Sequence, residues 1–374
     1  MNDNNNKQKR ICWITSSCFL DVDIPIVPRL KKIYDIDWII VSTPRTLEDD
    51  KKYLESITDC NYDITSSESR WYSREADKFC QNLFKSVSSR NYDWYYLDYS
   101  SLLYGFQAAA KYLPIDKVTV AAHNVTTPNG GRLYYLAKYN MGFLLRKFKN
   151  FQVFSLNQKK ALEQRKPGAD IFYCPLALKD YGVSQSSDKS SVRTFLYFGN
   201  ILGYKRVDVL LNAVNILIEK GISDFKVKIA GYCPSNDWDN KYLPLVRHPE
   251  IVNTDIRRIP SDKVARLFES SDYFVMPYQS IAQSGAMTVA LNYNLPIIAS
   301  NLDTFREFIT DNETGWFFET GNTVALAELM ERLIKMPDKE YEGVRTNQNE
   351  FVKRNLSIES IVSRYSNYFD KCLN

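Results

Sequence analysis

Apolar and polar positions alternate along the chain in a way that predicts strands and helices in turn. Between 207 and 218, apolar residues recur at the three- to four-residue spacing of a helix that buries one face. Phe225, Val227 and Ile229 alternate with polar residues, which predicts a strand. Strands and helices at such intervals predict a doubly wound α/β domain. Further runs predict strands at 195–198, 273–276, from 296 and around 316–318, and helices at 261–270, from 284 and at 323–335.

The first half of the chain shows the same alternation less regularly. Residues 42–75 are polar and show no clear period, and the polar run 183–191 is the best candidate for a linker. We therefore predict Rossmann-like domains over 1–182 and 194–352, a linker over 183–193 and an amphipathic terminal helix within 353–374. Candidate strands in the first domain are 11–15, 38–41, 94–97, 118–122, 151–155 and 171–174, with helical character at 27–34 and 102–112.

Composition fits a two-domain globular protein of 374 residues, with 44% hydrophobic and 25% charged residues. The net charge of +4 is mild and predicts no nucleic-acid partner. Seven scattered cysteines without a Cys-x-x-Cys pair, and only two histidines, favour reduced thiols over disulfides or a metal centre. The polar leader lacks a signal-peptide core, and no run approaches the ~20 apolar residues of a membrane span. We expect a cytoplasmic protein, at most peripheral on the inner face of the plasma membrane.

One stretch, 132–149, mixes tyrosine, leucine and basic residues as RLYYLAKYNMGFLLRKFK. Aromatic rings and lysines suit a membrane interface, where a lipid-linked substrate would lie. An ordinary half-buried helix with a solvated basic face is the alternative, and we favour it because the positive residues are not confined to one stripe.

Two strand ends in the second half carry features that suit a phosphate group. In MPYQSIAQSGAMTVALNYNLPIIAS, a helix beginning at Ser284 and Gly285 leaves backbone N–H groups and a positive dipole end outside the sheet. The other strand end has Gly199-Asn200 followed by Lys205 and Arg206, and two cations facing a helix N-terminus would hold a diphosphate. Each feature also has a simpler interpretation. The helix start at Ser284 fits a capped helix that only packs, and the Lys205-Arg206 pair fits a solvated basic surface.

Five blocks then resemble, in order, the second domain of GT-B glycosyltransferases, particularly family 4. They are FGNILGYKRVDVLLNAVNIL, KIAGYCP, IPSDKVARLFESSDYFVMPY, QSGAMTVALNYNLPIIASNLDTFREFI and DNETGWFF. The resemblance covers about 194–335 well and the first half loosely, through VTVAAHN and VFSLNQKKAL. It implies a GT-B fold of two Rossmann-like domains across a cleft, with the terminal helix crossing back to the first domain. It also implies a retaining hexosyltransferase that uses a UDP- or GDP-sugar without a metal, in bacterial surface polysaccharide or glycoconjugate synthesis, on a glycan or lipid-linked acceptor.

Residue by residue, Lys205 matches the family lysine on the donor diphosphate, and Asn200 stands where the family usually has arginine, so that Arg206 is a possible replacement. The family's two glutamates fall at Ile281 and Val289, so this chain resembles a Gln-Ser-Gly variant that lacks both carboxylates. Glu307 matches a later family glutamate, with a structural role as the alternative. The donor pocket implied by the resemblance comprises Gly199, Asn200, Arg258, Ile259, Gln283, Ser284, Gly285, Ala286, Met287 and Thr288.

In the first half, His123 resembles a family histidine that lies over the donor sugar, although a strand-end histidine bonded to backbone also fits. Asp21 and Asp23, placed in the loop after the first strand, are candidates for orienting the acceptor, as are Asp98 and Asn124. Solvated acids are the simpler interpretation of the three aspartates.

The implied chemistry breaks the anomeric bond of a nucleoside-diphosphate sugar while an acceptor hydroxyl attacks from the same face. Lys205, Arg206 and the helix dipole would offset the charge that grows on the diphosphate. Two other functions stay open. A hydrolysing sugar-nucleotide epimerase needs placed carboxylates, which the motif lacks, and a non-catalytic nucleotide-sugar-binding subunit would explain the missing glutamates.

Overall fold

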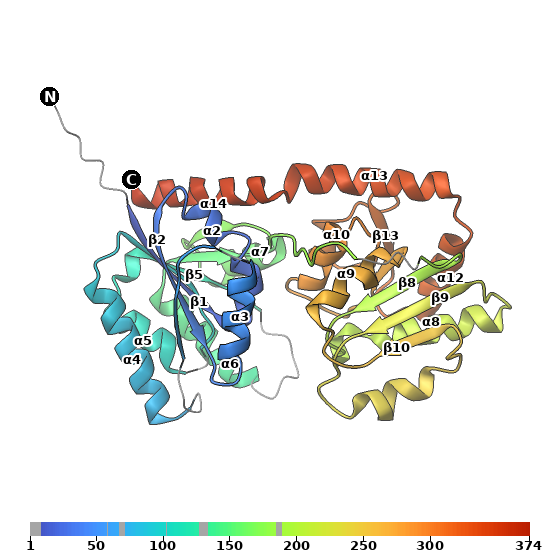
Figure 1. The fold of residues 1–374 in the computed structure, drawn as a ribbon, viewed down its shortest axis with the longest axis horizontal. Helices are drawn as coiled ribbons and strands as arrows, with labels where there is room; N and C mark the ends of the chain where they lie inside the picture. The colour runs from blue at the N-terminus through green and yellow to red at the C-terminus, as the bar shows by residue number, and fades with distance from the viewer. Residues whose placement is uncertain (1–8, 58, 67–71, 102, 127–133, 185–188) are drawn as a thin grey trace. The chain divides into compact units, whose positions relative to one another are not determined.

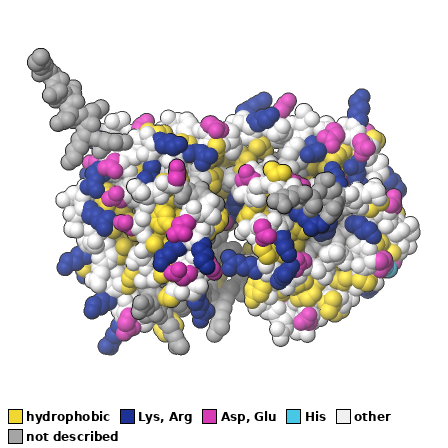
Figure 2. All heavy atoms as spheres, in the orientation of Figure 1, with side chains coloured by type: hydrophobic (Ala, Val, Ile, Leu, Met, Phe, Trp, Pro, Cys, Tyr) yellow, Lys and Arg dark blue, Asp and Glu magenta, His cyan; other side chains and the backbone are white. Residues whose placement is uncertain are grey.

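The computed structural model describes residues 9–57, 59–66, 72–101, 103–126, 134–184 and 189–374 (Figure 1). The chain divides into two compact units. Unit 1 comprises Met1–Ala177 and Ile358–Asn374, and unit 2 comprises Leu178–Ser357. Basic and acidic side chains are interspersed over the face shown in Figure 2, as the mild net charge predicts.

The described part of unit 1 contains a parallel seven-stranded sheet in the order β3-β2-β1-β4-β5-β6-β7. Strand β1 pairs with β2 on one side and with β4 on the other, so the direction of winding reverses between β1 and β4. The strands are β1 (Arg10–Ser16), β2 (Asp35–Ser42), β3 (Asp63–Ser66), β4 (Trp94–Asp98), β5 (Val118–Ala121), β6 (Asn150–Val153) and β7 (Asp170–Tyr173).

Helices cover both faces of this sheet because successive side chains of each buried strand point to opposite sides. In β1, Ile11 and Trp13 enter one core, while Cys12 and Ile14 enter the other. The helices are α1 (Leu20–Asp23), α2 (Val27–Leu30), α3 (Leu47–Ile57), α4 (Arg74–Ser89), α5 (Tyr104–Tyr112), α6 (Tyr134–Lys147), α7 (Leu156–Arg165) and α14 (Ile358–Leu373), with short 3-10 turns η1 (Ser17–Phe19) and η2 (Ile115–Lys117).

The terminal helix α14 completes the core of unit 1. Ile361, Tyr365 and Phe369 are fully buried at helical spacing among side chains of β1, β4 and α2. The Tyr365 hydroxyl accepts a hydrogen bond of 2.7 Å from the Gln152 side chain. Tyr34 donates through its hydroxyl to Asp370 Oδ1 at 2.6 Å. Apolar packing and buried polar bonds together hold the helix against the sheet.

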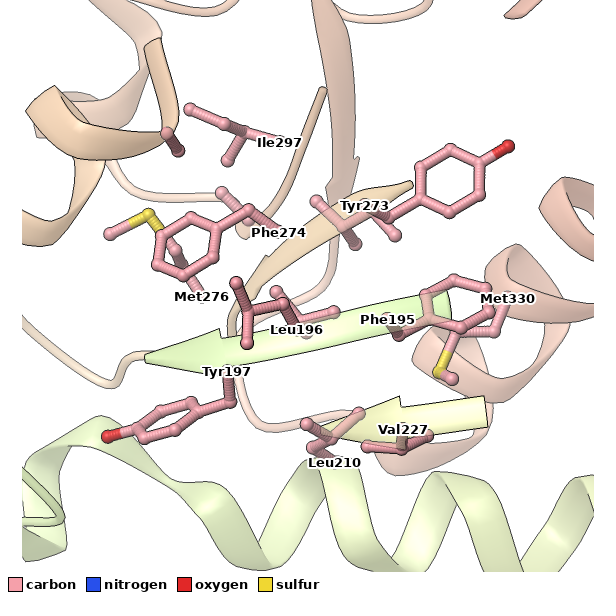
Figure 3. Close-up of a cluster of buried hydrophobic side chains, with 14 of the residues drawn as sticks. Phe195, Leu196, Tyr197, Leu210, Val227, Tyr273, Phe274, Met276, Ile297 and Met330 are labelled. Carbon is pink, nitrogen blue, oxygen red and sulfur yellow. The ribbon is translucent and has the colours of Figure 1, made fainter. Parts of the chain in front are cut away.

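The described part of unit 2 contains a parallel six-stranded sheet in the order β10-β9-β8-β11-β12-β13. Its core gathers apolar side chains from β8, β9, β11 and β12 with those of the covering helices (Figure 3). The strands are β8 (Arg193–Phe198), β9 (Phe225–Ala230), β10 (Val252–Asp255), β11 (Tyr273–Met276), β12 (Ile297–Ser300) and β13 (Gly315–Phe318). The helices are α8 (Val207–Glu219), α9 (Ser261–Glu269), α10 (Gly285–Asn292), α11 (Asp303–Arg306), α12 (Thr323–Ile334) and α13 (Asp338–Asn355), with short turns η3 (Gly203–Lys205), η4 (Trp238–Tyr242) and η5 (Leu243–Leu245).

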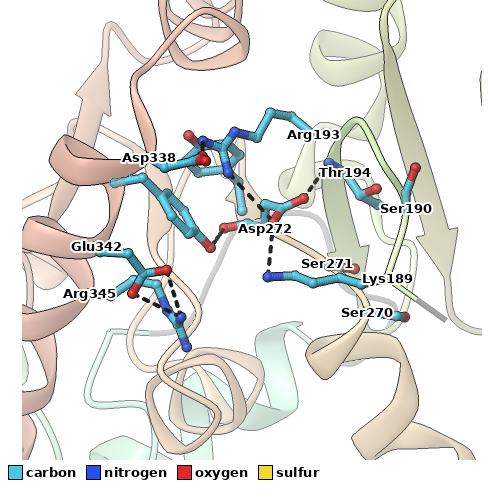
Figure 4. A network of polar contacts seen from close by, with 12 residues as sticks. Lys189, Ser190, Arg193, Thr194, Ser270, Ser271, Asp272, Asp338, Glu342 and Arg345 are labelled. Carbon is cyan, nitrogen blue, oxygen red and sulfur yellow. Dashed lines mark hydrogen bonds and ion pairs between the residues drawn. The ribbon is translucent and has the colours of Figure 1, made fainter. Parts of the chain in front are cut away.

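A polar cluster around Asp272 fixes the end of the unit 2 sheet where β8 and β11 begin (Figure 4). The Thr194 N–H donates to Asp272 Oδ2 at 2.9 Å, and Lys189 Nζ lies 3.4 Å from Oδ1. The Tyr341 hydroxyl of α13 donates to the Asp272 carbonyl at 2.9 Å. These groups satisfy a nearly buried carboxylate and tie α13 to the sheet.

The structure confirms the predicted fold class of two doubly wound α/β domains. The predicted helix at 27–34 was wrong in extent, because α2 ends at Leu30. Residues 42–75, which showed no period, contain α3 and β3. The sequence patterns also missed α4, α7, β10 and α13. The domain boundaries at 182, 193 and 352 stay predictions.

Within the tyrosine-rich stretch, Tyr134–Lys147 form α6, residues 148–149 follow the helix, and the first two residues lie outside the described part of the chain. Asn140, Met141 and Leu144 are buried, while 84% of Tyr135 and 57% of Tyr139 are exposed. The helix therefore has one buried and one exposed face, and its contact with a membrane stays a prediction. Over the described ranges, no helix combines the length and apolar character needed to cross a bilayer.

Candidate functional site

In unit 2, the two strand ends singled out from the sequence are neighbours. Strand β8 leads into η3 and α8, the adjacent strand β11 leads into α10, and the winding of the sheet reverses between them. Loops that leave such a reversal point diverge and expose the carboxyl ends of the strands, where open α/β sheets bind ligands.

Gly199, Lys205 and the first turn of α10 converge at this point. A Cβ added to Gly199 would lie 3.3 Å from Lys205 Nζ and 3.9 Å from Ala286 Cβ. Gly199 has a φ of 119°, which side-chain-bearing residues rarely adopt. The absent side chain therefore leaves room for the ammonium group beside the helix start.

Lys205 is held by its own short turn and by the end of β11. The Gln279 N–H donates to the Tyr204 carbonyl at 2.7 Å, and Lys205 Nζ lies 5.3 Å from the centre of the buried Tyr278 ring. Burial lowers the pKa of Lys205 from its ordinary 10.5 to about 8. No carboxylate in the described ranges lies within ion-pair distance of its ammonium group. The site therefore holds a partly desolvated cation without an anionic partner.

The start of α10 adds backbone donors to this cation. Ser284 caps the helix, since its Oγ accepts from the Met287 N–H at 3.3 Å. The preceding N–H groups, on Gly285 and Ala286, have no partner within the helix, and they point out at its positive end. Ser284 can therefore cap the helix while the start of the same helix binds a phosphate group. The capping bond uses the Met287 N–H group and not those of Gly285 and Ala286.

Lys179 is a residue of this site that sequence reasoning missed. A Cβ added to Gly285 would lie only 2.9 Å from Lys179 Nζ, so this ammonium group lies against the first residue of α10. Lys179 follows β7 in an irregular segment without a motif. Nothing in the local sequence pattern could have distinguished it from other surface lysines.

Arg206 is engaged differently from Lys205. It adopts a left-handed conformation with φ of 49°, and its guanidinium donates to Asp208 from Nε at 3.0 Å and from Nη2 at 2.8 Å. Nη1 donates to the Gln279 side chain at 2.9 Å. Asp208 therefore offsets the charge of Arg206. Asn200 is exposed, and its carbonyl accepts from the Tyr197 hydroxyl at 3.1 Å.

The other predicted donor residues surround α10 or lie on the loop after β10. Met287 and Thr288 are buried, and the Thr288 hydroxyl donates to the Gly285 carbonyl at 2.7 Å. Gln283 is partly buried, Arg258 is exposed and Ile259 is partly buried. Of the two positions where glutamates are missing, Val289 is buried in the core and Ile281 is partly buried against it. A hollow of about 490 Å³ near β12 and β13 contains none of these residues.

In unit 1, His123 lies two residues beyond β5 and contacts Asp98, the last residue of β4. Their Nε2 and Oδ1 atoms are 2.6 Å apart. The imidazole ring is stacked between Phe19, at 3.8 Å between centroids, and Phe154, at 4.5 Å. The two stacked rings fix the plane of the imidazole. The contact with Asp98 shows that His123 bonds a buried carboxyl group rather than backbone alone.

The segment after His123 is anchored to α7. The buried Gln158 side chain accepts from the Val125 N–H at 2.7 Å, and Arg165 donates to the Val125 carbonyl. Asn124, between these anchors, is exposed. The predicted pair His123-Asn124 therefore presents one largely buried and one exposed side chain at the carboxyl end of the sheet.

The structure corrects the placement of the aspartates that follow β1. Asp21 and Asp23 lie on the short helix α1, not in a loop, and Asp23 is fully buried. Asp23 Oδ2 accepts from Trp13 Nε1 at 2.8 Å and from Thr15 Oγ1 at 2.5 Å. Asp98 is also fully buried, and desolvation raises the pKa of both carboxyl groups. The solvated interpretation was therefore wrong for Asp23 and Asp98.

Comparison with known proteins finds a family match for part of the chain. Residues 192–336 match the family model described as Glycosyl transferases group 1. A capsular polysaccharide biosynthesis glycosyltransferase of Staphylococcus aureus is 26% identical over 139 residues, which are 37% of this chain and 36% of that protein. The alignments with three curated relatives cover 48%, 36% and 48% of the relatives' own lengths, which is less than half in each case.

Solved structures match the whole chain. A glycosyltransferase from Rickettsia africae superposes with a TM-score of 0.77 at 16% identity, covering 98% of this chain and 99% of that one. An Anabaena protein, HepE, solved in complex with UDP and glucose, gives a TM-score of 0.75 at 12% identity, covering 97% of this chain and 100% of its own. The chain therefore has the GT-B glycosyltransferase fold predicted from the sequence.

Proposed function

We propose that this protein is a glycosyltransferase that moves a sugar from a nucleoside-diphosphate sugar to a hydroxyl group of a glycan or lipid-linked acceptor. The observation that carries the proposal is the unpaired, partly buried ammonium of Lys205 beside Gly199 and the start of α10. An anionic diphosphate would complete this site, because it supplies a counter-charge, which Lys205 lacks among the described residues, and acceptors for the N–H groups at the start of α10. The UDP complex of a structural neighbour and the capsular relative support a UDP-sugar donor and a role in surface polysaccharide synthesis.

The proposed reaction needs stabilisation of the leaving diphosphate more than it needs a covalent intermediate. As the anomeric bond breaks, negative charge grows on the diphosphate, and Lys205, Lys179 and the α10 dipole would offset it without a metal ion. We assign His123, Asn124 and Asp21 of unit 1 to the acceptor side, with the buried Asp98 positioning His123. Same-face attack by the acceptor hydroxyl would retain the anomeric configuration.

We expect one of UDP-, GDP- and ADP-glucose to raise the thermal midpoint of the protein, because a ligand that binds only the native state stabilises it. With a panel of glycoside acceptors, that donor should release its nucleoside diphosphate at a rate unchanged by EDTA. Binding of none of the three donors would contradict the proposed site. Tight binding without turnover would instead identify a binding subunit, and an epimerised donor formed without acceptor would identify an epimerase.

Donor affinity is expected to fall at alkaline pH. An anionic diphosphate favours the charged form of Lys205, whose pKa is lowered to about 8. Binding above that pH therefore requires proton uptake, and affinity for UDP-glucose should drop about tenfold between about pH 7 and about pH 9. Calorimetric titration across this range measures the effect.

Lys205→Arg is the matched control, because the guanidinium stays charged throughout this pH range. Its affinity should be nearly independent of pH over the interval in which the wild-type affinity falls. An identical decline in both proteins would show that another group is responsible for the pH dependence.

A further inference from the structure

The carboxyl groups of Asp23 and Asp98 meet in the interior of unit 1. Asp23 ends α1, which follows β1, and Asp98 ends the adjacent strand β4, so the two come together at the reversal point of this sheet. Both side chains are fully buried, and desolvation together with the charge of Asp98 raises the pKa of Asp23. Two ionised carboxylates can only accept, so a hydrogen bond between them requires a proton on one of them.

The observed contacts of the two carboxyl groups show which of their oxygens are already engaged. Trp38 Nε1 donates to Thr15 Oγ1 at 2.8 Å, which leaves the Thr15 hydrogen for Asp23 Oδ2. Trp13 donates to the same oxygen, and His123 contacts Asp98 Oδ1. Asp23 Oδ1 and Asp98 Oδ2 are buried and have no hydrogen-bond partner in the described part of the chain. A proton shared between these two atoms would satisfy both of them.

A shared proton would leave the pair with one negative charge rather than two, because two neighbouring carboxyl groups in a buried site resist ionising together. Other titratable groups act on the two carboxyl groups from each packed element. They are Cys18 of η1, Asp21 of α1, Tyr96 of β4 and Tyr365 of α14, together with His123 itself. In that state Asp98 carries only part of one negative charge beside His123. Such a partner favours a neutral imidazole that donates from Nε2.

We propose that Asp23 is a positioning residue that shares one proton with Asp98 and thereby keeps His123 neutral, with its hydrogen on Nε2 and its lone pair on Nδ1. Asp23 acts through Asp98 and does not contact the imidazole in the observed hydrogen bonds. The significance of this state for catalysis rests on the proposed function, in which His123 belongs to the acceptor side. The protonation state itself does not depend on that function.

Histidine-ring NMR on the full-length protein tests the proposal, because the chain has only two histidines. His248 lies in unit 2 beside Glu250 and serves as the internal control. In the wild type, His123 should be the neutral Nε2–H tautomer at neutral pH. Asp23→Asn replaces the shared proton by an amide N–H, so Asp98 ionises fully and the pKa of His123 should rise by about one unit.

Asp98→Asn should have the opposite effect, lowering the pKa of His123, because it removes the carboxyl group that accepts from Nε2. In both variants His248 should titrate as in the wild type. An unchanged titration of His123 in Asp23→Asn would overturn the proposal.

Infrared spectroscopy of the wild type supplies a test that needs no variant. A buried protonated carboxyl group should give a carbonyl-stretch band at neutral pH, and the absence of such a band would also overturn the proposal. Neither method requires turnover. A negative result therefore leaves the proposed transferase activity standing, while failure to detect transfer would leave the shared proton unaffected.

Discussion

Replacing Lys205 with methionine is expected to lower the rate of sugar transfer at saturating donor by roughly 10²–10³-fold, the usual effect of removing one preorganised charge-stabilising group. The lost interaction is with charge that develops as the diphosphate leaves, so kcat should fall together with donor affinity. Initial rates measured against donor concentration separate the two effects. An unchanged kcat would remove Lys205 from the proposed mechanism.

Stability measurements distinguish this role from a structural one. The pKa of Lys205 lies below its ordinary value in the folded protein, so burial of the charged form costs stability at neutral pH. That cost is fully present below about pH 8 and disappears as the pH rises past 10.5, when the unfolded chain also loses the proton. Lys205→Met should therefore keep or raise the thermal midpoint while activity is lost. Lys263→Met, at an exposed position on α9, should change neither activity nor midpoint.

Replacing Gly231 with alanine is expected to destabilise unit 2 by roughly 3 kcal/mol, since it combines a backbone strain with a steric clash. Gly231 has a φ of 152°, and an added Cβ would lie 2.0 Å from the Gly199 carbonyl oxygen. Gly199 must move to relieve the contact, and it borders Lys205 Nζ. Chemical denaturation and donor titration should therefore show losses of both stability and affinity.

Gly221→Ala separates the two components of this effect. Gly221 also has a positive φ, of 81°, but nothing lies within 4 Å of its added Cβ. This control should cost only about 1 kcal/mol, the conformational penalty alone, and should leave donor affinity unchanged. Equal losses in the two variants would show that the contact with Gly199 is unimportant.

The sequence predicted unit 2 more completely than unit 1 for a physical reason. Helix α8 buries apolar residues at regular spacing, strand β8 before it contains the apolar run 195–198, and strand β9 after it alternates apolar and polar residues. Helix α13 was missed because it buries only Tyr341, Val344, Gln348 and Val352 among charged residues, so its periodic signal is weak. The short strand β3 has no fully buried residue and lies at a sheet edge.

The candidate site shows the same limit. Lys205 and Ser284 could be predicted because each follows a strand and begins a helix within a recognisable pattern. Asp23 could not, because adjacent acids on a short segment look alike in sequence, and its burial is decided by Trp13 and Thr15 of β1. Lys179 reaches α10 only through the folded chain. When the role of a residue depends on contacts with residues distant in the sequence, no local sequence pattern indicates that role.

The return of α14 to unit 1 has a consequence for how the protein is made. Unit 2 is continuous, and its last core residue is Leu356, whereas the core of unit 1 also needs Ile361, Tyr365 and Phe369. Vectorial synthesis on the ribosome therefore begins unit 1 first but completes it last. The apolar surface that α14 covers in the finished unit 1 therefore stays exposed on the nascent chain. It stays so while the whole of unit 2 emerges and forms its core.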